Sequence, residues 1–289
     1  MRALRLLDEN QLAECAVAVS AERTWFDTAR AFDGVAAEYH DTNSANPILR
    51  HMRARALSAL RRHAASGARV LDLGCGPGTD HPAMLAAGYS VTAIDISPEM
   101  VRRAQRRAEA TGGPHRPTIY CRSIDQLEMF ASGTFDAVFS NFGPLNCVDD
   151  LDRTARMIHD VLRPGGVLVA SVIGRVCPWE IGLYLSRGNV ARALLRFRQA
   201  AVPVPLKDGT VWTRYYTPAQ LEQSFVRSGF ARRELQALGV IAPPPYLEAF
   251  AARRPHLVDR LLRFDAVVGA WPGVRGYGDH FLTVLRRAD

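Results

Sequence analysis

Lysine is almost missing from this chain: Lys207 is the only one, and arginine supplies the rest of the 36 lysine and arginine side chains. Such an uneven choice indicates a coding bias towards arginine more than selection for phosphate contacts, although the net charge is +7. The densest basic stretch, residues 50–62, has apolar residues at helical spacing and no interleaved aromatic residues, which is typical of a solvated helix face. We therefore expect no nucleic-acid partner.

Long apolar runs are missing as well. No segment approaches the roughly 20 apolar residues that a membrane-spanning helix requires, and the amino terminus lacks the pattern of a signal peptide. The sequence therefore predicts no membrane span and a cytoplasmic location.

Cysteine is sparse and irregularly spaced. The chain has five, an odd number with no paired spacing and no zinc-type cluster: Cys15, Cys75, Cys121, Cys147 and Cys177. This pattern favours reduced thiols over a disulfide framework, and we expect no metal site.

Glycine, in contrast, is concentrated in one motif. Residues 70–80 read Val-Leu-Asp-Leu-Gly-Cys-Gly-Pro-Gly-Thr-Asp, an apolar strand pattern that contains Asp72 and is followed by Gly74, Gly76 and Gly78. Glycine is needed where a chain turns sharply and where a ligand approaches the backbone without a Cβ in the way. The motif therefore predicts a strand followed by a ligand-binding loop.

A second acidic strand end follows about twenty residues after the glycines, where open α/β sheets place the carboxylate that holds a ribose. Residues 91–95 form this short apolar run, and it ends in Asp95. A dinucleotide loop would read G-x-G-x-x-G/A, but Thr79 stands at the third glycine position. Asp72 would also repel a pyrophosphate, whereas it suits a cationic ammonium group. The spacing thus favours an adenosine-like ligand with a cationic part.

The combination resembles motif I of the class I S-adenosylmethionine-dependent methyltransferases, in particular the small-molecule type similar to ubiquinone and menaquinone methylases. The resemblance implies S-adenosyl-L-methionine as cofactor and S-adenosyl-L-homocysteine as product. It places the methionine part at Asp72 and the glycine loop, and the ribose at Asp95. The cofactor contacts that it implies are Tyr39, Asp72, Gly74, Cys75, Gly76, Gly78, Asp95, Ile96, Met100, Ser123, Ile124, Asp125, Asn141, Phe142 and Gly143.

One of these segments departs from the family pattern. Ser123 follows the expected third strand, residues 118–121, at a position where an aspartate is common. The resemblance therefore assigns the adenine to Ser123 and Ile124, with Asp125 as the alternative if the register differs. The loop of residues 141–143 follows the fourth strand, where the transferred methyl group would emerge.

Strands and helices alternate from residue 70 to residue 171, which predicts an α/β fold. Ser97 and Pro98 form a helix start, and Pro164 with two glycines stops the helix of residues 151–162. We expect a doubly wound, Rossmann-like and mostly parallel seven-stranded sheet, whose last strand, residues 278–285, is antiparallel. An N-terminal helical lid and an inserted helical cap complete the expected fold.

The predicted domains are an N-terminal helical lid, residues 1–46, and a core, residues 47–289, with substrate-cap insertions at about 174–210 and 243–274, the latter containing one amphipathic helix. The pattern from Phe32 to Tyr39 resembles the segment that precedes motif I in small-molecule methyltransferases, where it folds over the cofactor. Tyr39 would then line the methionine pocket, although its helical spacing from Phe32 suits simple packing equally well.

Methyl transfer is an in-line displacement, so a general base is needed only if the acceptor carries a proton that must leave. Five residues in the predicted cap or at strand ends are candidates: His280, Glu180, Tyr215, Tyr216 and His40. Each has a plain structural alternative, such as a capping glutamate or a packed tyrosine. Cys147 lacks the Pro-Cys pair of cytosine-C5 enzymes, so packing is its expected role.

The leading hypothesis is a methyltransferase, monomeric or homodimeric, that acts on a small, partly apolar molecule such as a specialised metabolite or a quinone-like compound. An RNA- or protein-modifying methyltransferase is the alternative, but the N/D-P-P-Y/F loop of amino-directed nucleic-acid enzymes is missing after Asn141. A non-catalytic protein that binds S-adenosylmethionine stays open, because it would have the same fold.

Overall fold

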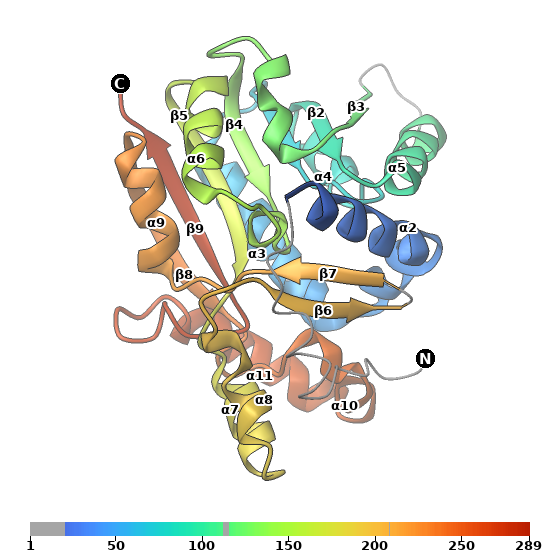
Figure 1. The fold of residues 1–289 in the computed structure, drawn as a ribbon, viewed down its shortest axis with the longest axis vertical. Helices are drawn as coiled ribbons and strands as arrows, with labels where there is room; N and C mark the ends of the chain where they lie inside the picture. Colours follow the sequence, from blue (N-terminus) through green and yellow to red (C-terminus); the bar gives the residue numbers. More distant parts are fainter. Residues whose placement is uncertain (1–20, 112–115, 208) are drawn as a thin grey trace.

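Seven strands form one mixed sheet in the computed structural model, which describes residues 21–111, 116–207 and 209–289 (Figure 1). In spatial order they are β3 (Thr118–Cys121), β2 (Ser90–Asp95), β1 (Arg69–Leu73), β4 (Phe135–Ser140), β5 (Leu162–Ile173), β9 (His280–Arg287) and β8 (Phe230–Leu238). The first five are parallel, and β9 is antiparallel to both of its neighbours. This confirms the predicted fold class, the sheet and its antiparallel last strand.

Helices connect these strands and flank the sheet. Those before residue 200 are α2 (Ala21–Ala45), α3 (Pro47–His63), α4 (His81–Ala86), α5 (Pro98–Thr111), η1 (Ile124–Met129), η2 (Pro144–Asn146), α6 (Leu151–Val161), α7 (Pro178–Leu185), α8 (Val190–Ala193) and η3 (Leu195–Phe197). Those after residue 215 are α9 (Pro218–Arg227), η4 (Pro245–Leu247), α10 (Glu248–Arg253) and α11 (Pro255–Val268).

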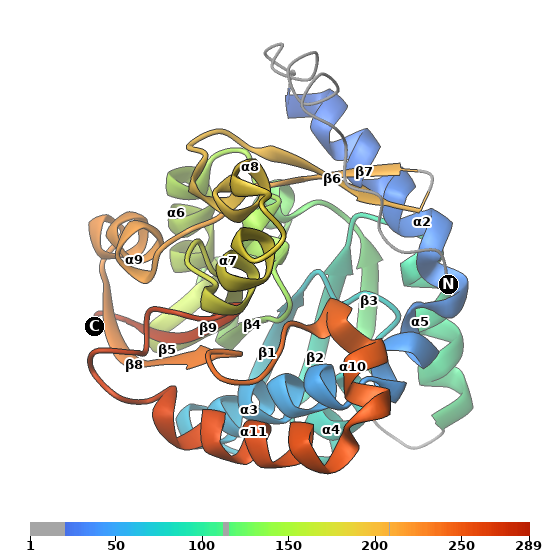
Figure 2. The ribbon, with the colours of Figure 1, turned by 90° about the horizontal axis from the view of Figure 1, so that it is seen from below.

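The central strands are buried on both faces, so each carries nearly continuous apolar sequence. Val70 of β1 belongs to a core layer with α3, α4 and α11, whereas its neighbour Leu71 belongs to a layer with α6 and α9. This alternation is the two-residue period of a strand. Figure 2 shows α3, α4 and α11 together on one side of the sheet.

Local helix signals operate as the sequence predicts. The Ser97 hydroxyl accepts a hydrogen bond from the Met100 amide at 3.1 Å, and Pro98 opens α5. The boundary at Pro164 differs from the expectation, because β5 already begins at Leu162, where it pairs with Phe135 of β4. The turn glycines therefore lie within the assigned strand rather than before it.

We had expected the first insertion to be helical, but only part of it is. It contains α7, α8 and η3, but it continues into β6 (Val202–Leu206), which pairs with β7 (Gly209–Thr213) as a separate two-stranded sheet. The Trp212 indole donates to the Asp27 carboxylate of α2 at 3.2 Å, and Lys207 donates to the Gly34 carbonyl at 2.8 Å. Alternating prolines in β6 favour such an edge hairpin over a helix.

The second insertion contains two α-helices, preceded by the short η4, instead of the single helix expected. Pro255 removes a backbone donor, so α10 ends at Arg253 and α11 begins anew. Val258 and Leu262 of α11 pack into the core layer that contains α3. The carboxylate of Asp265 accepts hydrogen bonds from the four consecutive amides of residues 239–242 at 2.7–3.3 Å. This segment therefore lies on the flank of the sheet.

Two further expectations concern membrane-spanning helices and disulfide bonds. Within residues 21–289, apart from 112–115 and 208, no helix is long and apolar enough to cross a membrane. Four of the cysteines carry free thiols, and Cys15 lies outside the described residues, as do the first twenty residues of the expected lid.

Candidate active site

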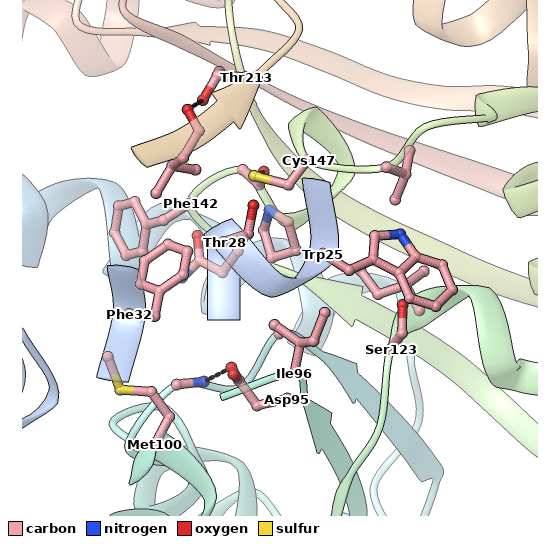
Figure 3. Close-up of a pocket in the computed structure, with 18 of the residues that line it drawn as sticks. Trp25, Thr28, Phe32, Asp95, Ile96, Met100, Ser123, Phe142, Cys147 and Thr213 are labelled. Atoms are coloured by element: carbon pink, nitrogen blue, oxygen red, sulfur yellow. Dashed lines mark hydrogen bonds between the residues drawn. The ribbon is translucent and has the colours of Figure 1, made fainter. Parts of the chain in front are cut away.

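An open cavity of about 950 Å³, its mouth included, lies at the carboxyl ends of β1, β2 and β4, beneath α2 and β7 (Figure 3). Twelve of the fifteen predicted cofactor contacts line it: Tyr39, Gly74, Gly76, Asp95, Ile96, Met100, Ser123, Ile124, Asp125, Asn141, Phe142 and Gly143. Open α/β sheets bind ligands at this edge. The geometry brings the predicted residues together, while their contact with a cofactor stays a prediction.

The glycine loop and the second acid are joined directly. The Gly76 amide donates to Asp95 Oδ2 at 2.8 Å, and the Ser97 amide donates to Asp95 Oδ1 at 2.9 Å. Gly76 has a φ of +54°, and a Cβ built there would find only Tyr39 Cε1, at 3.9 Å. The bare backbone of Gly76 therefore faces free space beneath the Tyr39 ring, as a ligand-binding loop requires.

Asp95 is buried although it carries a carboxylate. Burial raises its pKa to about 6, against the lowering effect of the backbone donors of Ser97 and Gly76. Each oxygen receives one backbone hydrogen bond and keeps further acceptor capacity. The ionised group can thus accept hydrogen bonds from a neighbouring diol.

Three predicted contacts do not line the cavity. Asp72 is 3% exposed and lies behind the loop, where the His81 ring is 3.1 Å from its carboxylate. Burial raises the pKa of Asp72, and the hydrogen bond to His81 opposes this shift. Gly78 packs on His81, because a Cβ at Gly78 would lie 2.8 Å from the ring. Cys75, the third, is half-buried and contacts the core. Cofactor contacts from all three remain unproven predictions.

The adenine candidates form one local structure. Ser123 caps η1, because its hydroxyl accepts from the Asp125 amide and donates to the Asp125 carboxylate, both at 3.2 Å. Both side chains and Ile124 line the same part of the cavity. Ser123 and Asp125, which the sequence analysis gave as alternative adenine contacts, are therefore hydrogen-bonded to each other.

Phe142 has a strained backbone at the end of β4, with a φ of +61°. The Arg53 guanidinium lies over its ring at 5.0 Å from the centroid, and His280 meets it edge-on at 5.9 Å. Arg53 also pairs with Asp80 at 2.5 Å, and Asn141 donates to Asp80 at 3.2 Å. Asn141 Oδ1 is buried and has no hydrogen-bond partner among the described residues.

None of the five candidate bases lines the cavity. His40 is held between Thr79, at 3.0 Å, and Arg107, at 3.1 Å, and burial lowers its pKa. Glu180 pairs with Arg196 at 2.6 Å. Both side chains are therefore engaged in contacts between elements.

The other three candidates lie just behind the cavity wall. His280 contacts the Asp279 carboxylate at 2.9 Å. Burial raises the pKa of Tyr215 to about 12, and its ring lies beneath Arg196. Tyr216 is buried beneath the wall, and its hydroxyl has no partner among the described residues.

The part of the chain that the structure describes contains one group of metal-ligand residues, and this group surrounds a cation of the protein itself. Atoms of Cys177, Glu180 and Asp279 lie within 4.8 Å of one another. Arg196 Nη2 is 2.6 Å from Glu180 and 2.8 Å from Asp279. The guanidinium thus contacts both carboxylates of the cluster and offsets one of their two negative charges.

Ten further residues line the cavity that the sequence analysis did not assign as cofactor contacts. Those from the cover are Trp25, Thr28, Phe32, Val211 and Thr213; those from the sheet side are Arg122, Pro144, Cys147, Val148 and Ile173. The first three share one face of α2 at spacings of three and four residues, and the two on β7 alternate as strand neighbours do. These spacings can be seen in the sequence, but only the fold shows that both faces line the cavity.

Cys147 also lines the cavity. Burial raises the pKa of the Cys147 thiol to about 12, so it is protonated at neutral pH.

The middle of the chain resembles known proteins. Residues 70–166 match a protein family described as "Methyltransferase domain". The chain is 36% identical over 110 residues to the ubiquinone biosynthesis O-methyltransferase of Xanthomonas axonopodis pv. citri (strain 306), which is 38% of this chain and 45% of that protein. It is 35% identical over 145 residues to the malonyl-(acyl-carrier protein) O-methyltransferase of Enterobacter lignolyticus (strain SCF1), or 50% and 53% of the two chains. The chain spans about half the length of the curated relatives it matches.

The whole fold also resembles a solved structure. It is the 1,6-didemethyltoxoflavin-N1-methyltransferase of Burkholderia thailandensis, solved with 1,6-didemethyltoxoflavin and S-adenosylhomocysteine bound. The TM-score is 0.60 at 17% identity, and the likeness covers 100% of both chains. At this identity the likeness concerns the fold, including the parts on either side of the matched domain.

Proposed function

We propose that this chain, whose residues 70–166 match a methyltransferase domain, transfers the methyl group of S-adenosylmethionine to a small, partly apolar acceptor. The observation that carries this proposal is the link between Gly76 and Asp95 at one end of a cavity whose cover is aromatic and apolar. The relatives support it, since two of them are named as methyltransferases of small or carrier-bound compounds.

The residues at the sheet edge fit this cofactor. Gly76 leaves space for a ligand against its backbone, and Asp95 keeps acceptor capacity suited to ribose hydroxyls. Asn141 Oδ1 is a buried acceptor without a partner in the same cavity. Ser123 and Asp125 supply polar atoms at the end that we assign to the adenine.

When bound, the cofactor supplies a methyl group on a sulfonium sulfur, which leaves as a neutral thioether. The chain itself binds, orients and dehydrates the acceptor. Trp25 and Phe32 of α2 line the cavity, where their apolar rings would exclude water and hold the acceptor near the sheet edge (Figure 3). Well-oriented reactants alone lower such a barrier by roughly 7–11 kcal/mol. None of the five candidate bases lines the cavity, and a base is needed only for an acceptor whose proton must leave, which a water at the open mouth of the cavity could then accept.

Labelling tests the activity. The full chain is incubated with methyl-labelled S-adenosylmethionine and a fractionated extract of its source cells, and the fraction that gains label is identified. We expect label in the small-molecule pool. Label in RNA or protein instead would favour a macromolecular substrate, and no label despite tight cofactor binding would favour a non-catalytic protein.

Cofactor binding is tested independently by titration with S-adenosylhomocysteine. Asp95→Ala removes the proposed ribose acceptor, and Gly76→Val fills the space beneath Tyr39 and strains a left-handed backbone. Both variants should lose measurable binding. Unchanged affinity in both would refute the assigned site, whereas Glu109→Ala, at an exposed position on α5, serves as a control that should bind normally.

A further inference from the structure

Two polar groups of the described cover have no hydrogen-bond partner, the Trp25 indole N–H and the Thr28 hydroxyl, and of these only the hydroxyl can both donate and accept. Thr28 lies on α2, is 6% exposed and lines the cavity, and its hydroxyl has no hydrogen-bond partner among the described residues. A threonine inside a helix usually satisfies its hydroxyl on the carbonyl of the preceding turn. A buried hydroxyl without a partner costs stability unless a ligand completes it.

The surroundings of Thr28 are aromatic and uncharged. Figure 3 shows Thr28 between Trp25 and Phe32 along α2. Phe142 lines the cavity from the sheet side. Two other hydroxyls line the cavity from the cover: that of Thr213 donates to the Val211 carbonyl at 3.5 Å, and that of Tyr39 is not among the buried atoms without a partner. Thr28 thus carries the one buried hydroxyl of the described cover that has no partner.

These observations describe a site for a flat ring with one polar group. Aromatic rings pack against Trp and Phe with favourable edge and stacking geometries. The cover wall carries no charged side chain among its described residues, so a charged acceptor would lose its hydration without compensation there. A neutral ring that carries a hydroxyl, a carbonyl or a ring nitrogen meets both conditions.

We propose that the Thr28 hydroxyl hydrogen-bonds the polar substituent of a planar, uncharged aromatic acceptor, and so determines which acceptor is methylated. The inference rests on the proposed function and deepens it by naming the acceptor class and the residue that selects it. A site built to hydrogen-bond one substituent rejects an analogue that lacks it more strongly than an apolar pocket does.

A binding experiment without turnover tests this role. The full chain is saturated with S-adenosylhomocysteine, and the affinities of 2-naphthol and of 2-methylnaphthalene, which replaces the hydroxyl by a methyl group, are measured by equilibrium dialysis. Thr28→Val should weaken 2-naphthol binding about fivefold to tenfold and leave 2-methylnaphthalene unchanged. Thr28→Ser keeps a hydroxyl and should retain most of the 2-naphthol affinity.

Three outcomes would overturn the inference. An equal loss for both probes would make Thr28 a packing residue, and binding of neither probe by the unaltered chain would exclude a planar ring. A weaker S-adenosylhomocysteine affinity in Thr28→Val would show that the hydroxyl holds the cofactor. If the unaltered chain failed to bind S-adenosylhomocysteine at all, the proposed function would fail, and this inference with it.

Discussion

Asp33 of the cover helix α2 accepts a hydrogen bond from the Ser97 hydroxyl at 2.5 Å, across 64 positions of sequence. The same oxygen accepts from the Glu99 amide at 2.9 Å, so Asp33 caps α5 from another element. Ser97 in turn donates its amide to Asp95. The position of the cover is therefore linked to the proposed ribose carboxylate through a single serine.

We expect Asp33→Ala to lower the free energy of unfolding by about 1–2 kcal/mol, because the Ser97 hydroxyl and the Glu99 amide lose the carboxylate that accepts their hydrogen bonds. Cofactor affinity should fall as well, since Ser97 positions Asp95. Thermal unfolding with and without S-adenosylhomocysteine measures both effects. Asp33→Asn keeps an oxygen at the accepting position, so its stability and cofactor affinity should lie between those of Asp33→Ala and those of the unaltered chain. If Asp33→Ala had the same unfolding temperature and the same S-adenosylhomocysteine affinity as the unaltered chain, the hydrogen bonds of Asp33 would contribute neither to stability nor to binding.

Cofactor affinity should depend on pH through Asp95. Burial raises its pKa to about 6 in the folded chain, from an ordinary value of 3.8. Below pH 6 the carboxyl is protonated and loses acceptor capacity, so the affinity for S-adenosylhomocysteine should weaken as pH falls from 7 to 5 and stay level from 7 to 8. Isothermal titration across this range measures it. Asp95→Asn should remove the pH dependence, and a profile shared by both chains would assign it to another group.

The raised pKa of Asp95 also makes the stability of the fold depend on pH, in the opposite direction to the cofactor affinity. Because the folded pKa lies above the unfolded value, the folded chain binds more protons between about pH 4 and pH 6. The contribution of Asp95 to stability is therefore present below pH 4 and lost as the pH rises through 6. Comparing urea unfolding of the unaltered chain and Asp95→Asn at pH 5 and pH 7 isolates it.

Gly209 permits the close approach of the β6–β7 hairpin to α2. A Cβ at Gly209 would lie 2.6 Å from the Ala31 Cα and 2.7 Å from its Cβ. Gly209→Ala should push the hairpin away from α2 and speed amide hydrogen exchange in both segments. Gly182→Ala is the matched control, because a Cβ there meets nothing within 4 Å and alanine favours helix α7. Equal exchange in the two variants would contradict tight packing at Gly209.

Arg196 should be needed for stability. It is almost fully buried between Glu180 and Asp279, and Arg196 holds the pKa of Asp279 well below its usual range although burial opposes this. Arg196→Met leaves two buried carboxylates without a counter-charge, which typically costs about 3–5 kcal/mol. Thermal and urea unfolding measure the loss, and Arg187→Met, at an exposed position, is the control. A loss below about 1 kcal/mol would indicate that water reaches the pair.

Much of the candidate site was readable in the sequence because it depends on local chemistry. Gly76 and Asp95 each lie at the end of a strand, and parallel strands bring such ends to one edge. Asp72 shows the limit of this reasoning: the same strand end carries it, but its side chain points behind the loop to His81. The direction of a side chain at a strand end depends on what packs on each face.

The cover was predicted less well, and the reason is physical. The hairpin of residues 202–213 and the break at Pro255 depend on whether partners are available for backbone groups and apolar faces. Glu180 looked suited to act as a base, but Arg196 lies next to it only in the folded chain, sixteen residues further on. Pairings of this kind have no sequence period and were not predicted.

The sequence alone determined the alternation of strands and helices, the glycine loop and the two acidic strand ends, because strand period, helix caps and backbone freedom at glycine are properties of neighbouring residues. The tertiary structure decided which faces meet. It brought Thr28 and Thr213 of the cover into one cavity with Asp95, and it withdrew Glu180 into an ion pair. Such contacts join distant segments, and their energy depends on burial and packing that arise only when the whole chain folds.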